Sequence, residues 1–195
     1  MSPNYQALWS RAADPRGLTF YSGPVAAEPL ASVDMSDEEA ERWLALAVKF
    51  AVANVESGGG GPFASIIVRG GEVIGRGVNR VIRDLDPTAH SEIVAIRAAC
   101  RQALHFRLPG AVLVSTCELC PMCLTAALWA DVGRIVYAVD RYEAAAAGFP
   151  QVELYDLFED PQHLWSVPVR KISIAQAQDP FEAWRRTKPQ RQARP

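Results

Sequence analysis

Hydrophobic residues recur three and four positions apart in the segment that follows Asp34. This spacing predicts a helix of about 20 residues with one apolar stripe, and Ser36 or Asp34 can cap its start. Four glycines at 58–61 end the pattern. The stripe is expected to be buried and consists of Trp43, Leu44, Ala47, Val48, Ala51 and Val55.

Two apolar segments, 63–68 and 72–78, lie on either side of a pair of adjacent glycines. Because glycine accepts a positive φ at low cost, the pattern predicts two antiparallel strands joined by a tight turn. Short apolar runs at 111–115 and 134–139 are bounded by turn-forming or polar residues, which is typical of buried strands.

Helical patterns alternate with these strands. One runs from just after Thr88 to Leu104, with its apolar residues on a single face. Another begins at Pro121, a good first residue for a helix, and continues to about Ala130. Strands that alternate with helices predict a sheet covered on both faces. We therefore expect an α/β protein with a three-layer α/β/α sandwich.

The two ends of the chain differ from this pattern. Residues 167–174 alternate between apolar and polar side chains, and Pro168 places the resulting strand at an edge of the sheet. With it, the central mixed sheet is expected to have five strands. A last helix is predicted over 179–187. Residues 1–33 follow neither period and are interpreted as an N-terminal extension to a domain that spans 34–195.

Composition excludes several classes of protein. The 195 residues are 49% hydrophobic and 22% charged, which fits a globular domain and not a disordered chain. The net charge of -2 and the pI near 5.9 argue against a broad nucleic-acid-binding surface. The start of the chain lacks the pattern of a secretory leader, and apolar runs are too short for a membrane span. These features predict a soluble, cytoplasmic protein without a membrane partner.

Two short fragments carry candidate chemistry: His90-Ser-Glu92 and Cys120-Pro-Met-Cys123. Each lies at the predicted start of a helix, where the helix dipole favours thiolates. One imidazole and two thiolates form a zinc set, and three protein ligands leave a fourth position open, as in catalytic sites. Glu92 lies close enough to His90 to act as a general base without ligating the metal.

A closed structural site is the alternative interpretation of the cysteines. Cys117 extends the spacing to C-x2-C-x2-C, so it can provide a fourth zinc ligand or join an iron–sulfur cluster. However, Cys117 ends a predicted strand, whereas Cys120 and Cys123 belong to the following helix. The catalytic interpretation is therefore preferred. Cys100 is interpreted as part of helix packing.

The H-x-E and C-x-x-C pair is a signature of zinc-dependent nucleobase deaminases. From about Asp34 onward the sequence resembles the cytidine deaminase superfamily, and within it the bacterial guanine deaminases. Besides the two fragments above, the resemblance rests on Gly61-Pro-Phe63, Gly77-Val-Asn79, Asp86-Pro-Thr-Ala-His90, Cys117-Glu118, Cys120-Pro-Met-Cys-Leu124, Ala147-Gly-Phe149 and Pro180-Phe-Glu-Ala-Trp-Arg185.

The resemblance implies hydrolytic deamination with Zn²⁺ held by His90, Cys120 and Cys123. It also implies that Glu92 moves a proton to a ring nitrogen and then to the departing ammonia. Guanine, converted to xanthine, is the first choice of substrate. The alternatives are another amino-heterocycle or nucleoside, such as a modified purine, a pterin-like ring or a cytosine-type pyrimidine. A tRNA adenosine deaminase and a zinc-stabilised scaffold without catalysis are also considered.

Further residues match the family's substrate contacts. Asn79 matches an asparagine that hydrogen-bonds the base, and Phe63 and Trp129 match aromatic pocket positions. Glu143 matches an acid that assists proton transfer or contacts the substrate. Each has a simpler structural interpretation: core packing for the two aromatic residues, a turn for Asn79, and a favourable helix start for Glu143.

Departures from the family pattern leave the identity of the base open. Ser91 stands where the family usually has alanine, and its hydroxyl is expected at the rim of the pocket as a substrate contact. Leu119 replaces a proline, and Thr125 stands where glycine is common. The resemblance also implies a homodimer in which the helix at 179–187 crosses to the partner and covers its active site.

Overall fold

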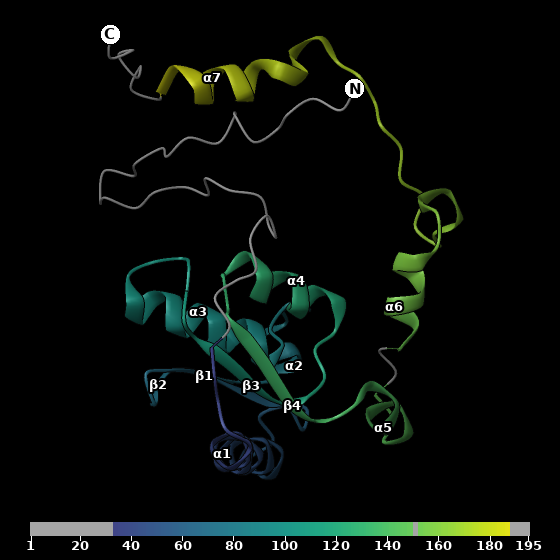
Figure 1. Ribbon diagram of the computed structural model, residues 1–195. Helices are drawn as coiled ribbons and strands as arrows, with labels where there is room; N and C mark the ends of the chain where they lie inside the picture. Colours follow the sequence, from purple (N-terminus) through teal and green to yellow (C-terminus); the bar gives the residue numbers. More distant parts are fainter. Residues whose placement is uncertain (1–32, 150–151, 188–195) are drawn as a thin grey trace, which may run out of the picture. The chain divides into compact units, whose positions relative to one another are not determined.

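The computed structural model describes residues 33–149 and 152–187 (Figure 1). The part that ends at Glu159 forms one compact unit, and the part from Asp160 onward belongs to another. Four strands form a single sheet in the first unit, in the order β2-β1-β3-β4. Their bounds are β1 Ala64–Arg69, β2 Glu72–Val78, β3 Val112–Cys117 and β4 Arg134–Val139.

The sheet is mixed, as expected. Strand β1 is antiparallel to both β2 and β3, whereas β3 and β4 are parallel. The hairpin between β1 and β2 turns at Gly70 and Gly71, whose φ angles are 60° and 78°. Both angles lie in the left-handed region that glycine adopts without strain, so the turn predicted from the sequence is confirmed.

Helices cover both faces of the sheet (Figure 1). Helix α1 (Asp37–Glu56) packs on one face, with Ser36 accepting a hydrogen bond from the backbone N–H of Glu39 at 3.2 Å. Helices α3 (Ser91–Ala103) and α4 (Pro121–Trp129) pack on the other face. Each interface has its own apolar cluster, so the three layers predicted from the pattern are present.

Two glycines in β2 allow α3 to approach the sheet closely. A Cβ at Gly75 would lie 2.6 Å from the carbonyl oxygen of Ala95, and one at Gly77 would lie 2.2 Å from that of Ser91. Any side chain at these positions would push the helix away. Gly77 therefore determines how deep the first turn of α3 lies, and that turn carries the candidate site residues.

The predicted fifth strand at 167–174 is wrong: these residues form no strand in the part of the chain that the structure describes. Alternation alone does not make a strand, because a strand also needs a partner with free hydrogen-bonding groups. The apolar side chains of the segment are exposed: Val167 68%, Val169 54%, Ile172 67% and Ile174 62%. The described sheet therefore has four strands, and β4 is its edge.

Two other expectations about burial need correction. Val48 and Val55 belong to the predicted apolar stripe of α1, but they are 44% and 48% exposed. Strand β4 is also predicted to be buried, yet Tyr137 and Val139 are 45% and 37% exposed. Apolar periodicity identified the elements, but burial depends on what packs against them.

The remaining elements are short. They comprise α2 (Val81–Asp84), α5 (Arg141–Ala146), α6 (Val152–Glu159), the 3-10 turns Gln162–Leu164 and Ala175–Gln178, and α7 (Asp179–Thr187). Helix α7 has the bounds predicted for the last helix. Nearly all of the predicted extension, residues 1–32, lies outside the described residues.

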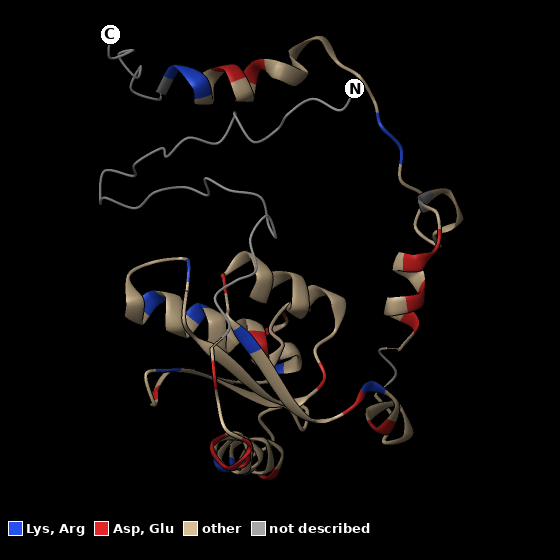
Figure 2. Ribbon diagram, viewed as in Figure 1, with Lys and Arg blue, Asp and Glu red and all other residues tan. Residues whose placement is uncertain are grey.

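Charged residues are dispersed over the described elements. Figure 2 shows acidic residues grouped at the start of α1 and along α6, with basic residues spread over α3, the strands and α7. None of the helices described in 33–149 and 152–187 combines the length and apolar character that a bilayer crossing requires.

Candidate active site

Three potential metal ligands converge between α3 and α4. His90 is the N-cap residue of α3, Cys120 is the N-cap residue of α4, and Cys123 lies in the first turn of α4. One donor atom from each residue lies within 4.8 Å of the others. The two helix starts predicted from the sequence thus bring the imidazole and the two sulfurs to one point.

The donor set fits zinc. The Sγ of Cys120 lies 3.7 Å from Nδ1 of His90. A tetrahedral zinc with bonds of about 2.3 Å to sulfur and about 2.0 Å to nitrogen separates these two donors by about 3.5 Å. The separation of these two donors is therefore compatible with a shared zinc ion. A site with one imidazole and two thiolates binds Zn²⁺ through three protein ligands.

The electrostatics of the two cysteines favour metal binding. Hydrogen bonding from Cys123, assisted by His90, lowers the pKa of Cys120 to about 4. The same contact raises the pKa of Cys123, whose thiol donates to the neighbouring sulfur. The contact with Cys120 also raises the pKa of His90. The lowered pKa favours the thiolate form of Cys120, which is the form that zinc requires.

Cys117 does not belong to this donor group. It is the last residue of β3, and the group found among the described residues consists of His90, Cys120 and Cys123. Three ligands leave one position of a tetrahedral ion free for water, so the geometry favours a catalytic site over a closed structural one.

Glu92 lies beside the metal ligands in the first turn of α3 and is only 6% exposed. Burial raises the pKa of its carboxyl group. Ser91 donates a hydrogen bond of 2.9 Å to Oε2, and Ser115 donates one of 3.4 Å to Oε1. Glu92 is thus held by hydroxyl groups beside the three potential metal ligands.

His90 and Glu92 line a cavity of about 410 Å³. Phe63 and Asn79, which the sequence predicts as substrate contacts, also line this cavity. The two residues lie at the same end of the hairpin, because the backbone N–H of Asn79 donates to the carbonyl of Phe63 at 2.9 Å. The Oδ1 of Asn79 accepts from the N–H of Val81 at 3.4 Å, so the side chain also holds a turn.

A second cavity of about 530 Å³ adjoins the first and shares Phe63, Cys117 and Phe149 with it. Its lining is mostly apolar. Glu143 lies here and not in the cavity of Glu92. It forms a capping box with Asp140 at the start of α5, which is the structural role considered from the sequence.

Two predicted substrate contacts lie elsewhere. Trp129 ends α4, is 53% exposed and does not line the cavity of Glu92. Ser91 is completely buried, so its hydroxyl is not at the rim of the pocket. Helix geometry explains this difference: neighbouring residues of the first turn of α3 point in different directions, and Ser91 points toward the sheet.

Comparison with known proteins places this geometry in a family. Residues 37–139 match the cytidine and deoxycytidylate deaminase zinc-binding region. The chain belongs to this family of deaminases. It is therefore a zinc-dependent hydrolytic deaminase that acts on a C–N bond.

Individual relatives refine the comparison. The deaminase is 39% identical over 145 residues to guanine deaminase of Bacillus subtilis, covering 74% of this chain and 93% of the relative. The crystal structure of that enzyme superimposes with a TM-score of 0.74 at 36% identity, covering 81% of this chain and 99% of the other. A guanine deaminase from Nitrosomonas europaea gives a TM-score of 0.55 at 28% identity, covering 65% and 70% of the two chains.

Similarity to tRNA-specific adenosine deaminases is shorter. The protein from Buchnera aphidicola is 37% identical over 95 residues, which cover 49% of this chain and 62% of that relative.

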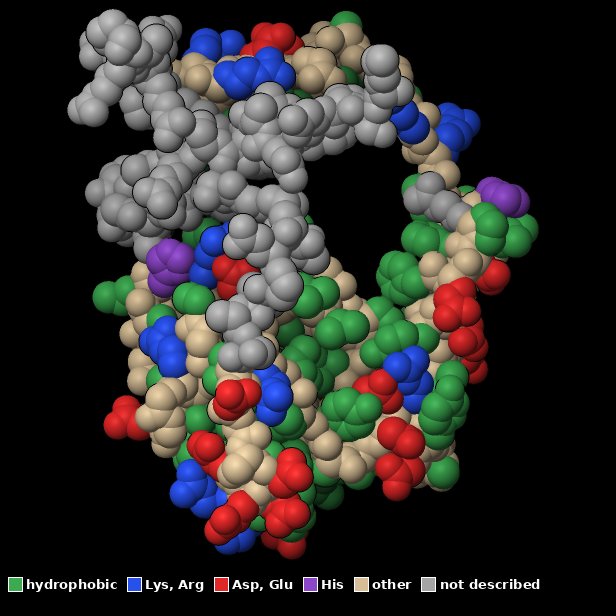
Figure 3. Space-filling model, in the orientation of Figure 1, with side chains coloured by type: hydrophobic (Ala, Val, Ile, Leu, Met, Phe, Trp, Pro, Cys, Tyr) green, Lys and Arg blue, Asp and Glu red, His purple; other side chains and the backbone are tan. Residues whose placement is uncertain are grey.

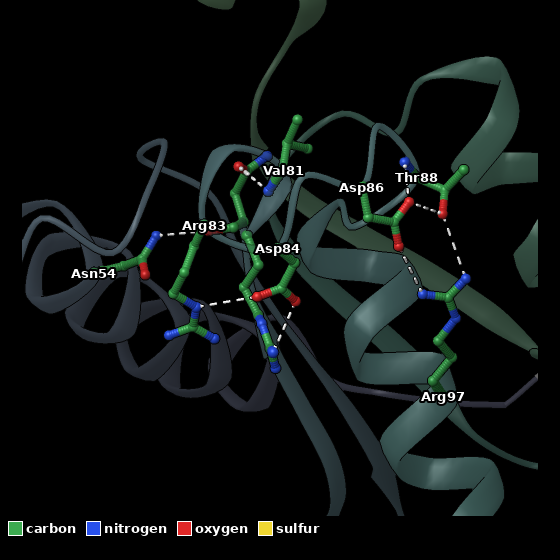
Figure 4. Close-up of polar contacts among 9 residues, drawn as sticks. Asn54, Val81, Arg83, Asp84, Asp86, Thr88 and Arg97 are labelled. Carbon is green, nitrogen blue, oxygen red and sulfur yellow. Dashed lines mark hydrogen bonds and ion pairs between the residues drawn. The ribbon is translucent and has the colours of Figure 1, made fainter.

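The segment between Asn79 and His90 connects two parts of the deaminase site and is braced by Asp86 (Figure 4). The Asp86 carboxylate accepts hydrogen bonds from the N–H and hydroxyl of Thr88 at 2.8 and 2.6 Å, and Arg97 of α3 adds a contact at 3.4 Å. These bonds lower the pKa of Asp86. They fix the loop that delivers His90 to the metal site.

Sequence reasoning missed Asn54, which braces the other side of the cavity. This buried side chain on α1, labelled in Figure 4, donates to the carbonyl oxygens of two residues. These are Gly61 and Asn79, both at 3.0 Å. It ties the glycine-rich loop to the segment that carries Asn79. The signal available in the sequence was an amide within an otherwise apolar helical stripe.

Glu118 was also missed as a structural residue. Its carboxylate binds the backbone N–H of Arg141 at 2.9 Å and pairs with the guanidinium group of the same residue. That guanidinium lies over the ring of Tyr155, whose hydroxyl donates to the carbonyl of Leu119. The ion pair and the hydrogen bond connect α5 and α6 to the loop that carries the metal ligands.

Proposed function

We propose that the deaminase converts guanine and water to xanthine and ammonia. The observation that carries this proposal is the similarity to a guanine deaminase over 145 residues, a span much longer than the segment from His90 to Cys123 that contains the metal ligands. A cavity of about 410 Å³ is of the size that binds small heterocycles.

The residues of the chain divide the reaction between them. Bound zinc supplies Lewis acidity, which makes water nucleophilic at neutral pH. Glu92 takes one proton of the attacking water and delivers it to a ring nitrogen of the purine. It then takes the second proton, from the hydroxyl that has been added to the ring carbon, and passes it to the amino group, which leaves as ammonia while the carbonyl of xanthine forms. Its raised pKa suits a group that must both accept and release a proton in each cycle.

Recognition of the base is assigned to the residues that line the cavity. The amide of Asn79 can donate and accept at once, which matches the edge of a purine. Phe63 offers a ring for stacking and is itself held by an edge contact with Phe149, with ring centroids 5.0 Å apart. Glu143 stays a candidate for substrate contact from the adjoining cavity.

The charge of the cavity favours a free base over a phosphate-bearing substrate. Its lining contains the carboxylates of Glu92 and Glu118 and no Lys or Arg among the described residues. A tRNA substrate needs cationic side chains to neutralise its phosphates. Other amino-heterocycles and nucleosides are the alternative substrates, because they also carry no phosphate.

Substrate class is tested by measuring ammonia release from guanine, adenine, 2,6-diaminopurine, guanosine, cytosine and a pterin. Guanine is expected to give the highest kcat/KM, with xanthine as the product by chromatography. A chelator should abolish the reaction, and added Zn²⁺ should restore it. Ammonia release from cytosine or a nucleoside, with none from guanine, would refute the assignment of guanine.

We also propose a cytoplasmic homodimer. Figure 3 shows hydrophobic side chains grouped on the surface over α4 and β4. Exposed members on these two elements include Leu128, Trp129, Tyr137 and Val139. Such a patch is typical of a protein interface. Light scattering on the purified chain should give twice the mass of 21.3 kDa.

Helix α7 is proposed to cover the active site of the partner subunit. Removing residues 179–195 should then lower kcat/KM without loss of zinc. An unchanged rate would refute this role for α7.

A further inference from the structure

Three serines lie beneath Glu92, each from a different element. Ser65 is on β1, Ser91 is on α3 and Ser115 is on β3, and all three are completely buried. Ser65 and Ser115 are direct partners across the antiparallel pair, and Gly77 is opposite Ser65 on the other side. This row of small residues is the surface on which the first turn of α3 rests.

The hydroxyl groups form a ring that closes through the carboxylate of Glu92. Ser65 Oγ lies 2.9 Å from Ser91 Oγ and donates to Ser115 Oγ at 3.1 Å. Ser91 donates to Oε2 of Glu92 at 2.9 Å, and Ser115 donates to Oε1 at 3.4 Å. Each carboxylate oxygen therefore has its own hydroxyl donor, and Ser65 joins the two donors.

Core packing does not explain these hydroxyl groups. Neighbouring positions on the same strands carry Ile66, Ile67 and Val114, which are also completely buried. A buried hydroxyl costs free energy unless it is hydrogen-bonded, and alanine would fill nearly the same volume without that cost. Three such groups meet at one carboxylate, which points to a role for the ring at that carboxylate.

We propose that Ser65, Ser91 and Ser115 are positioning residues that set the plane of the Glu92 carboxylate for proton transfer. This proposal rests on the proposed function as a deaminase. The terminal torsion of a glutamate has a broad intrinsic preference, so the side chain alone does not define this plane. Two donors, one on each oxygen, do define it. Hydroxyl groups also accept, so the ring can hold Glu92 both with and without its proton.

Ser65 has a distinct role because it contacts the other two serines and has no hydrogen bond to Glu92 among the described contacts. Its hydroxyl has one proton, so it donates to either Ser91 or Ser115, and the serine that accepts keeps its own proton directed at the carboxylate. The effect of Ser65 on catalysis must therefore pass through these two residues.

The first experiment measures kcat and KM for guanine in Ser91→Ala, Ser115→Ala and Ser65→Ala. We expect kcat to fall about 10- to 100-fold for Ser91→Ala, less for Ser115→Ala with its longer contact, and about 3- to 10-fold for Ser65→Ala. KM should change less than about 2-fold, because none of the three hydroxyls lines the cavity. Zinc content, measured by elemental analysis, should stay at the wild-type level.

Thr116→Val is the matched control. Thr116 is the neighbour of Ser115 on β3, is 7% exposed, and its hydroxyl accepts from the N–H of Ala64 at 3.1 Å. The variant also removes a buried hydroxyl that is hydrogen-bonded, but on the opposite face of the strand. We expect a comparable shift in the melting temperature and no change in kcat.

The second experiment tests whether Ser65 acts through its partners. The double variant Ser91→Ala/Ser115→Ala is compared with the triple variant that also carries Ser65→Ala. Because the donors to Glu92 are already absent, the third substitution should leave kcat unchanged. A destabilising effect of Ser65→Ala would still appear in the melting temperature, so the two effects are separable.

The outcomes are distinguishable. If wild-type protein deaminates guanine and Ser91→Ala retains its kcat, or raises KM instead, the positioning role is refuted. A further fall of kcat in the triple variant refutes the assignment of Ser65. If Ser91→Ala does not fold, Ser65→Ala and Ser115→Ala decide the question. Wild-type protein that releases ammonia from no compound in the panel refutes the proposed function itself.

Discussion

The inner and outer walls of the active-site cavity differ in how they are built. The inner wall carries Glu92, which is 6% exposed, above serines that are completely buried and held by paired strands and α3. The outer wall carries Ile82, Phe149 and Leu154, which are 78%, 38% and 46% exposed and come from short helices and turns.

This difference suggests separate roles for the two walls, one in the reaction and one in the choice of substrate. The inner wall is part of the core, where a substitution disturbs close packing and buried hydrogen bonds. The outer wall has fewer contacts to break, so its side chains can vary without unfolding the domain. We infer that the inner wall determines the reaction and that the outer wall adjusts which heterocycle is bound.

The largest expected effect concerns the inner wall. Glu92→Gln keeps the shape of the side chain but removes its ability to carry a proton. We expect kcat to fall by roughly 10²- to 10⁴-fold with zinc content unchanged, measured by ammonia release and elemental analysis. Glu72→Gln, at an exposed position at the start of β2, serves as the control. Retained turnover in Glu92→Gln would contradict the assigned mechanism.

Gly77→Ala tests whether the inner wall depends on the close approach of α3. The new methyl group would lie 2.2 Å from the carbonyl oxygen of Ser91, so the helix must shift. We expect a loss of stability of about 1–3 kcal/mol and a lower kcat, measured by chemical denaturation and ammonia release. If the Gly77→Ala variant were as stable as the wild-type protein, the helix would be free to move at this point.

Phe149→Ala tests the outer wall. It removes the ring that makes an edge contact with Phe63, leaving the metal ligands and Glu92 intact. We expect KM for guanine to rise several-fold, by about 0.5–1.5 kcal/mol of binding free energy, while kcat changes less. A large fall in kcat with constant KM would contradict the proposal that the outer wall affects substrate binding and not the reaction.

The smallest effect is expected for Cys117→Ser. Cys117 lies between the two cavities but outside the donor group. Zinc content should remain at the wild-type level, whereas Cys120→Ser and Cys123→Ser should lower it. Loss of zinc in Cys117→Ser would instead support the alternative interpretation, a structural zinc site with Cys117 as a fourth ligand.

Features that depend on neighbouring residues were predictable. The glycine pair at 70–71 identified the hairpin, and Pro121 identified the start of α4. His90 and Cys120 were placed at helix starts for the same reason. By contrast, the strand predicted at 167–174 is absent from the described sheet, because pairing requires a partner that the local pattern does not reveal.

The amino-acid sequence by itself determined the donor set, since spacing and helix caps are local properties: an imidazole and two sulfurs at helix starts, with an acid two residues from the imidazole. Only the tertiary structure decided where Ser91 points and which groups meet it. Ser65 and Ser91 are 26 residues apart, and Ser65 and Ser115 are 50 apart. Their hydroxyls meet because strand register and the close approach of α3 at Gly77 align three distant segments, a result of packing that no local pattern contains.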